Sequence, residues 1–190
     1  MSDNIRVGLI GYGYASKTFH APLIAGTPGM ALAAVSSSDA AKVHADWPSV
    51  PVVSEPKHLF NDPNIDLIVI PTPNDTHFPL AKAALEAGKH VVVDKPFTVT
   101  LSQARELDAL AKSLGRLLSV FHNRRWDSDF LTVKRLLSEG TLGEILFFES
   151  HFDRFRPQVR NRWLEQAGPG SGIWYDLAPH LLDQAVNLFG

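Results

Sequence analysis

The chain contains no cysteine among its 190 residues and only two methionines. The absence of cysteine excludes disulfides, thiolate metal sites and cysteine nucleophiles, and it is compatible with a reducing compartment. A net charge of −2 gives no electrostatic attraction to nucleic acid or to an anionic membrane. No apolar run reaches membrane-spanning length, and the first residues lack the basic and apolar regions of a signal peptide. We therefore expect a cytoplasmic protein that binds neither nucleic acid nor membrane.

What the chain does contain is a regular alternation of strand and helix patterns over residues 1–121. Short apolar runs alternate with segments of helical periodicity, and the connections between them are short. This alternation is typical of α/β proteins with a Rossmann-type doubly wound parallel sheet. The predicted strands are 5–10, 30–35, 50–53, 65–70, 90–93 and 117–121, and the predicted helices are 15–24, 40–45, 57–60, 74–87 and 101–114. Asn74 to Thr76 is expected to cap its helix, and Gly88 and Gly115 are expected to end theirs.

The pattern changes after Phe121. A helix is predicted over 130–137, a long strand over 145–152, a polar, arginine-rich loop over 153–166 and a final helix over 173–188. One strand with its helices is too little for an independent sheet domain. We therefore predict a complete dinucleotide-binding domain, residues 1–121, followed by the N-terminal part of a second domain, residues 122–190.

The first predicted strand runs directly into a glycine turn. Gly11 allows a tight turn, Gly13 lets a ligand approach the backbone, and the small Ser16 stands where a third glycine is usual. The helix that follows directs free N–H groups and its positive dipole end at one point, which suits a pyrophosphate. A glycine pair after a strand is a weak signal alone. It gains weight because segments 11–13, 36–39, 71–74 and 94–96 all follow parallel strands and should meet at one edge of the sheet.

The end of the second predicted strand distinguishes between the two nicotinamide cofactors. Enzymes that use NAD commonly place a carboxylate there to bind the ribose hydroxyls. Here the positions are Ser36 and Ser37, with no carboxylate before Asp39 and a cation at Lys42. Hydroxyls and a lysine suit a 2′-phosphate, so NADP is favoured over NAD. Alternatively, Ser38 and Asp39 serve only to cap the next helix, which is compatible with phosphate binding by the two serines.

Two further groups are candidates for chemistry. Lys95 follows a buried strand at the predicted crevice, where it is better placed for function than as a solvated surface charge. Asp176 and His180 lie four residues apart on one face of the last predicted helix, with Asp183 nearly on the same side. An acid that orients an imidazole can move protons near neutral pH. A surface ion pair or a metal pair would show the same spacing, although no further ligands support zinc, and we expect no metal.

Taken together, these segments resemble the Gfo/Idh/MocA family of sugar and polyol dehydrogenases. The resemblance covers the whole chain, and segments 13–20 and 122–127 are similar to the NADP-dependent scyllo-inositol dehydrogenases of that family. The motifs are Val7-Gly-Leu-Ile-Gly-Tyr-Gly13, Pro71-Thr-Pro-Asn74-Asp-Thr-His77, Asp94-Lys95-Pro96, Asn123-Arg-Arg-Trp126 and Gly170-Ser-Gly172-Ile-Trp-Tyr-Asp176-Leu-Ala-Pro-His180-Leu-Leu-Asp183.

The resemblance implies hydride transfer between a nicotinamide and a ring carbon that bears a hydroxyl. It implies that Lys95 contacts the reacting hydroxyl, that His180 is the general acid and base, and that Asp176 binds a neighbouring hydroxyl and supports the histidine. It also implies a cis peptide between Lys95 and Pro96. The residues expected to contact the cofactor are Gly11, Gly13, Tyr14, Ala15, Ser36, Ser37, Lys42, Pro71, Thr72, Asn74, His77, Asp94, Lys95, Asn123, Arg125 and Trp126.

Two departures from the family pattern stand out. The family usually has Glu at the position of Asp94, which is a conservative difference. In addition, most of the family's second domain, an α+β substrate-binding and oligomerisation domain, would lie beyond Gly190. We expect this 190-residue chain to bind NADP with low or absent turnover, and the full-length form to be a homo-oligomer acting on a polyol or sugar. The alternatives are a non-catalytic dinucleotide-binding regulator, and reduction of an imine or a linear tetrapyrrole on a similar fold.

Overall fold

The computed structural model describes residues 4–153, 155–159 and 161–190. Residues 1–3, where the absence of a signal sequence was expected, and positions 154 and 160 of the predicted arginine-rich loop lie outside the described part. The chain divides into two compact units, residues 1–121 and residues 122–190. Each unit is described by itself.

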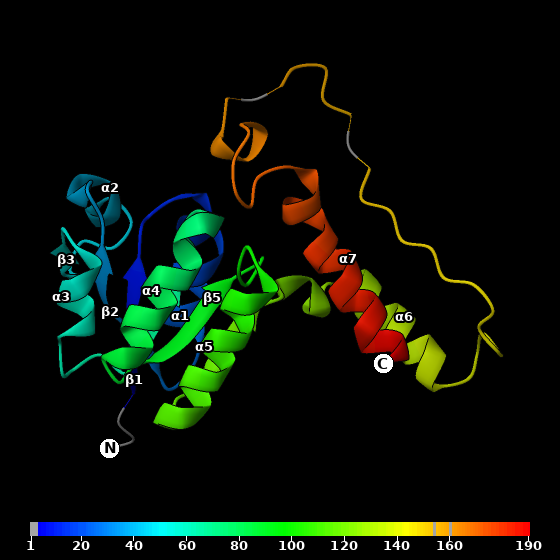
Figure 1. Ribbon diagram of the computed structural model, residues 1–190, viewed down its shortest axis with the longest axis horizontal. Helices are drawn as coiled ribbons and strands as arrows, with labels where there is room; N and C mark the ends of the chain where they lie inside the picture. The colour runs from blue at the N-terminus through cyan, green and yellow to red at the C-terminus, as the bar shows by residue number, and fades with distance from the viewer. Residues whose placement is uncertain (1–3, 154, 160) are drawn as a thin grey trace. The chain divides into compact units, whose positions relative to one another are not determined.

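The first unit is built on a six-stranded sheet in which every paired strand is parallel (Figure 1). The strand order is β3-β2-β1-β4-β5-β6. This is the doubly wound sheet that the alternating pattern predicts. The strands are β1 (Ile5–Ile10), β2 (Met30–Ser36), β3 (Val52–Val53), β4 (Leu67–Ile70), β5 (His90–Asp94) and β6 (Leu118–Phe121).

The central strands are buried on both faces, which explains their continuous apolar sequences. In β4, Ile68 and Ile70 face one hydrophobic cluster while Val69 faces the other. The first cluster packs against α3 (Pro56–Phe60), α4 (Asn74–Glu86) and α5 (Leu101–Leu114), and the second packs against α1 (Ala21–Gly26) and α2 (Ala40–His44). Alternate side chains along each strand thus pack against two layers of helices, one on each face of the sheet.

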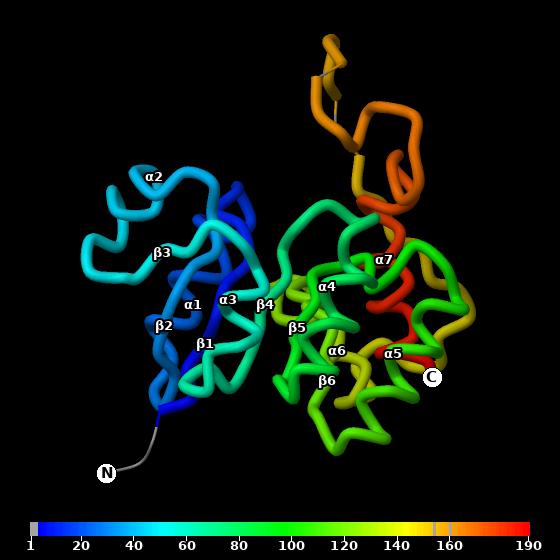
Figure 2. Tube along the Cα trace, turned by 60° about the vertical axis from the view of Figure 1, so that its left-hand side comes forward, coloured from blue at the N-terminus to red at the C-terminus, as the bar shows by residue number. Residues whose placement is uncertain are grey.

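The order of the strands opens a crevice beside β1. Strands β2 and β4 flank β1, as the view in Figure 2 also shows, and the chain crosses the sheet between β3 and β4. Helical connections on either side of such a crossing lie on opposite faces of the sheet, so the carboxyl ends of β1 and β4 are left open. This is where the predicted site residues of the first unit gather.

Local capping decides where the helices of the first unit begin and end. Thr100 and Gln103 form a complete capping box at the start of α5, and Gly115 ends that helix with a left-handed φ of 62°. The predicted end of α4 at Gly88 is also confirmed, with a φ of 78°. The predicted side-chain cap at the start of α4 is wrong. Pro73 is the N-cap, and the Thr76 hydroxyl bonds to the Pro73 carbonyl oxygen at 2.6 Å instead.

The second unit contains helices and irregular chain. Its elements are η2 (Asn123–Trp126), α6 (Ser128–Ser138), η3 (Trp163–Glu165) and α7 (Ile173–Phe189). The predicted strand over 145–152 is wrong, because that segment has no regular secondary structure. A strand needs hydrogen bonds from a neighbouring strand, and none of the described residues pairs with this segment. Leu146 and Phe147 are accordingly 87% and 79% exposed. Among the described residues, no helix has the length and apolarity needed to span a membrane.

Candidate functional site

The glycine turn after β1 has the geometry of a backbone cradle. Gly11 adopts a φ of 79°, which L side chains rarely adopt, and its N–H donates to the Ser36 carbonyl oxygen at 2.7 Å. A Cβ added at Gly13 would meet no atom within 4 Å, so this glycine borders open space. The turn leads through Tyr14 and Ala15 into a π-helical turn, η1 (Ser16–His20), which continues into α1. Ser16, in the place of the usual third glycine, is fully buried.

An open pocket of about 430 Å³ lies at the carboxyl end of β2, beside the glycine turn. Gly11, Gly13, Ser36, Ser37 and Lys42, all predicted cofactor contacts, line this pocket. The remaining lining residues are Ile10, Tyr12, Ser38, Asp39 and Ser54.

Asp39 is the only carboxylate that lines this pocket, and it is the N-cap of α2. Its side chain accepts the Lys42 N–H at 3.0 Å. The Ser37 hydroxyl accepts the Asp39 N–H at 3.1 Å, which closes the turn. The capping role proposed for Asp39 is therefore confirmed, and this carboxylate already has a partner. The Ser37 hydroxyl also donates to the Asp39 carbonyl oxygen at 3.2 Å, so a ligand would compete with that bond, whereas Lys42 contributes a cation to the lining of the pocket.

Tyr12, between the two glycines, ties the turn to the chain that follows α2. Its hydroxyl donates to Asp46 at 2.9 Å, and Lys17 forms an ion pair with the same carboxylate at 2.8 Å. The Lys17 ammonium first, and then the Tyr12 hydroxyl, hold the pKa of Asp46 below its ordinary value of 3.8. These contacts fix the pocket-forming helix α2 relative to the glycine turn.

We predict that Asp46→Asn makes the protein less sensitive to acid. A carboxyl whose pKa is lowered by folding stabilises the folded state above its unfolded pKa, and this contribution is lost as the pH falls through the folded pKa. The free energy of unfolding, measured by urea titration at about pH 6 and about pH 3, should therefore fall less in the variant. Asp108→Asn, which removes an exposed ion pair with Lys112 on α5, is the control. An equal acid loss in Asp46→Asn and in the unsubstituted chain would contradict the prediction.

The carboxyl ends of β4 and β5 form the second part of the site in the first unit. Pro71 and Thr72 follow β4, and Asn74, at the start of α4, is buried. His77 is fully buried, with Nδ1 2.8 Å from the Pro96 carbonyl oxygen and Nε2 2.9 Å from the Thr72 carbonyl oxygen. His77 therefore links the segments after β4 and β5 to each other.

Lys95 follows β5, as predicted, and the Lys95–Pro96 peptide bond is cis as the resemblance implies. Its N–H donates to Oδ1 of Asp94 at 2.7 Å. The other carboxylate oxygen of Asp94 lies 3.3 Å from Nε2 of His20. Asp94 is thus engaged with protein groups on both sides.

In the second unit, the predicted catalytic acid and imidazole both lie on α7. His180 is buried, and its ring packs against Phe152 with centroids 6.3 Å apart. Asp176 lines a pocket of about 300 Å³ together with Phe152, Arg162, Glu165 and Leu177, among others. Both residues therefore sit on a single rigid element. Among the described residues, no cluster of three or more His, Asp or Glu side chains is placed to hold a metal ion.

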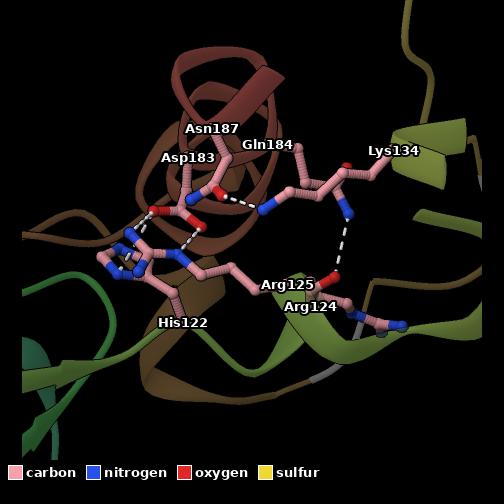
Figure 3. Close-up of polar contacts among 7 residues, drawn as sticks. All are labelled: His122, Arg124, Arg125, Lys134, Asp183, Gln184 and Asn187. Carbon is pink, nitrogen blue, oxygen red and sulfur yellow. Dashed lines mark hydrogen bonds and ion pairs between the residues drawn. The ribbon is translucent and has the colours of Figure 1, made fainter. Parts of the chain in front are cut away.

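A polar network joins α7 to the chain that follows β6 (Figure 3). Arg125 donates from Nε and Nη2 to the two carboxylate oxygens of Asp183 at 2.7 and 2.5 Å, and His122 Nδ1 lies 3.5 Å from the same carboxylate. Gln184 donates to the Arg124 carbonyl oxygen at 3.1 Å. The predicted cofactor ligand Arg125 is thus paired with Asp183. The hydrogen bond to this carboxylate raises the pKa of the Arg125 guanidinium above its ordinary value. Asn123 begins the same short helix, and Trp126 at its end is 75% exposed.

We predict that Asp183→Asn lowers the free energy of unfolding by about 1–2 kcal/mol, because Arg125 loses a charge-assisted bidentate partner. The Asp183 side chain is only 9% exposed, so water replaces the lost contacts poorly. Glu139→Gln is the matched control, since Glu139 also accepts two bonds from one arginine, Arg135, but on an exposed helix face. The control should cost less than about 0.5 kcal/mol by urea titration. Equal losses in the two variants would show that the network on α7 is no more than a surface ion pair.

Sequence reasoning missed two contributors to the site. Ser54 follows β3 at the same edge of the sheet as Ser36 and Ser37, so its position after a parallel strand was a usable signal. His20 was missed because its contact depends on the π-helical turn, which has more residues per turn than an α-helix. No spacing rule for a regular helix directs His20 at Asp94.

Comparison with known proteins agrees with this geometry. Residues 5–122 match the family model for the Gfo/Idh/MocA oxidoreductase family with an NAD-binding Rossmann fold, and residues 130–190 match the Gfo/Idh/MocA C-terminal domain. The chain is 88% identical to "Uncharacterized oxidoreductase YdgJ" of Escherichia coli, covering 100% of this chain and 55% of the relative. It is 42% identical to scyllo-inositol 2-dehydrogenase (NADP(+)) IolW of Bacillus subtilis, covering 99% of this chain and 52% of the relative.

A solved oxidoreductase structure from Yersinia pestis superimposes with a TM-score of 0.94 at 74% identity, covering 100% of this chain and 54% of that one. The chain thus spans about half the length of the curated relatives it matches. The parallel sheet, the glycine turn, and the matches across both units lead to one conclusion: this chain belongs to the Gfo/Idh/MocA family of oxidoreductases.

Proposed function

We propose that the protein is an NADP(H)-dependent oxidoreductase that transfers a hydride between the nicotinamide and a ring hydroxyl or ketone of a polyol or sugar resembling inositol. The name of the IolW relative, an NADP(+)-dependent scyllo-inositol dehydrogenase, supports both the cofactor and the substrate class. The observation that carries the proposal is the serine-lined pocket beside the glycine turn, whose only carboxylate already caps α2.

The residues of this pocket fit a dinucleotide. The space at Gly13, which an added Cβ would fill without a clash, admits a pyrophosphate against the backbone. Ser36, Ser37 and Lys42 would hold a 2′-phosphate through hydroxyl and ammonium donors. An unengaged carboxylate in their place would repel that phosphate and would select NAD instead.

The chain's own residues would then handle the proton. A bound NADP⁺ supplies a hydride acceptor and NADPH a hydride donor. Lys95 donates a hydrogen bond to the oxygen of the reacting hydroxyl, which lowers the cost of the negative charge that develops there. His180 accepts the hydroxyl proton in oxidation and returns it in reduction. Asp176 binds a neighbouring hydroxyl of the substrate and supports the imidazole, so that the reacting carbon is held in one orientation.

Cofactor titration is the first test of this proposal. We expect the chain to bind NADPH at least about tenfold more tightly than NADH, since a charge-assisted hydrogen bond contributes roughly 1.5–3 kcal/mol. Quenching of tryptophan fluorescence or calorimetry measures both dissociation constants. Equal affinities, or tighter binding of NADH, would exclude the proposed 2′-phosphate site.

Turnover with a substrate panel is the second test. Inositols and aldoses are assayed with NADP⁺ and NAD⁺, using this chain and a chain extended to the length of its relatives. We expect the extended chain to oxidise at least one inositol with NADP⁺ and the 190-residue chain to show low or absent turnover. Tight NADPH binding without turnover of any polyol in either chain would favour the alternative function, a dinucleotide-binding regulator.

A further inference from the structure

Two buried histidines contact the residues on either side of Lys95. His20 is 3% exposed and contacts Asp94, which precedes the lysine, whereas His77 is 0% exposed and contacts Pro96, which follows it. Buried polar groups are normally hydrogen-bonded, and these two histidines find partners in the two residues that flank one lysine. In both cases the partner lies beside the lysine that the proposed function places at the reacting hydroxyl.

The contact from His20 reaches Lys95 through a shared carboxylate. One oxygen of Asp94 lies 3.3 Å from His20 Nε2, and the other accepts the Lys95 N–H at 2.7 Å. The His20 ring also packs on Phe121 of β6, with centroids 4.3 Å apart, so it has little freedom to turn. Because each oxygen has its own partner, the carboxylate holds the Lys95 backbone at a defined distance from the π-helical turn.

The contact from His77 reaches the residue that follows Lys95. Its two ring nitrogens lie 2.8 and 2.9 Å from the carbonyl oxygens of Pro96 and Thr72. The ring therefore bridges the segment after β5 and the segment after β4, and because it is fully buried, water does not compete for these contacts.

We propose that His20 and His77 are positioning residues that together hold Lys95 in place. His20 connects the lysine to the helix that follows the glycine turn, and His77 connects it to the segment after β4. The segments that would contact the two ends of the cofactor therefore share one hydrogen-bonded frame with Lys95. This inference rests on the role that the proposed function gives to Lys95.

The role of His77 is tested without any turnover. In the 190-residue chain, His77→Phe removes both ring nitrogens and should raise the hydrogen-exchange rate of the Lys95 amide about tenfold relative to the Val92 amide in the same strand, because the turn that carries Lys95 loses its contact with the segment after β4. An unchanged Lys95 exchange rate in His77→Phe would refute the role of His77.

The positioning role is tested by amide exchange and by kinetics. His20→Phe should raise the hydrogen-exchange rate of the Lys95 amide about tenfold relative to the Val92 amide in the same strand, while His20→Gln, which keeps an N–H for Asp94, should restore much of the protection. His90→Gln is the matched control, because His90 lies at the opposite end of β5 and accepts the Leu117 N–H at 2.9 Å. An unchanged Lys95 exchange rate in His20→Phe would refute the role of His20.

In the chain extended to the length of its relatives, His20→Phe and His77→Gln should each lower kcat about tenfold or more and change KM for NADPH less than about threefold. Equal losses in kcat and cofactor affinity would indicate a merely structural role. If the unsubstituted protein oxidises no polyol, the proposed function fails, whereas the exchange measurements still decide whether the two histidines hold Lys95.

Discussion

Replacement of His180 by alanine is expected to lower turnover by about 10²- to 10⁴-fold, the range contributed by a positioned general acid and base. The affinity for NADPH should change by less than about twofold, since the pocket at the carboxyl end of β2 is built entirely from the first unit. Steady-state turnover of an inositol with NADP⁺, in a chain extended to the length of its relatives, measures the first quantity. Fluorescence titration measures the second.

The control for this prediction lies on the same helix. Asn187 of α7 accepts a hydrogen bond from Lys134 at 3.2 Å and has no proposed part in proton transfer, so Asn187→Ala should keep most of the turnover. Because His180 is buried, its loss also leaves a cavity, and urea titration shows whether the variant remains folded. A folded His180→Ala enzyme that retains full turnover would remove the imidazole from the mechanism and favour a regulator.

Replacement of Ser37 by aspartate is expected to reverse the cofactor preference. The new carboxylate would lie in the pocket that also contains Ser36 and Lys42, where it would repel a 2′-phosphate and accept hydrogen bonds from ribose hydroxyls. We expect the ratio of NADH to NADPH affinity to shift toward NADH by about 10²-fold, which corresponds to roughly 2.7 kcal/mol. Lys42→Ala should weaken NADPH binding alone, by about tenfold.

A neighbouring carboxylate provides the control. Asp39 lines the same pocket but caps α2, so Asp39→Asn, which keeps a capping oxygen, should change stability by less than about 1 kcal/mol and should shift the cofactor ratio much less than Ser37→Asp, and toward NADPH, because it removes a negative charge. Dissociation constants for NADPH and NADH, measured side by side for the three variants, test whether the cofactor preference changes as expected. A Ser37→Asp protein that still prefers NADPH would place the 2′-phosphate elsewhere.

Much of the first unit could be predicted because its signals are local. The apolar run ending at Ile70 is continuous since β4 is covered on both faces, and Gly115 stands where a helix must end in a left-handed residue. The position of the site at one edge of the sheet could be predicted from the same alternation of strands and helices. In a parallel sheet all strands end at one edge, so Gly11, Ser36, Thr72 and Lys95 could be expected together before any distance was known.

The failures have non-local causes. The segment 145–152 has a strand-like composition, but a strand exists only where a neighbour supplies hydrogen bonds, and composition does not reveal a neighbour. The predicted side-chain cap of α4 was wrong because the Thr76 hydroxyl donates to the carbonyl oxygen of Pro73 and so does not cap the helix. The pairing of the Arg125 guanidinium with Asp183, which lies 58 residues away in the sequence, was not predicted for the same reason, and the cofactor contact of Arg125 stays a prediction.

The sequence by itself determined the class of fold, the edge of the sheet at which the proposed cofactor site lies, and the absence of thiol chemistry. These depend on residue type and on periods of a few residues, which chain connectivity imposes. Only the tertiary structure decided which polar groups are already engaged. Asp39 caps a helix, and Asp183 pairs with Arg125. His20 and His77 contact Asp94 and Pro96 in the turn that carries Lys95. A hydrogen bond depends on distances of a few tenths of an ångström between segments far apart in the chain, and no local pattern specifies such distances.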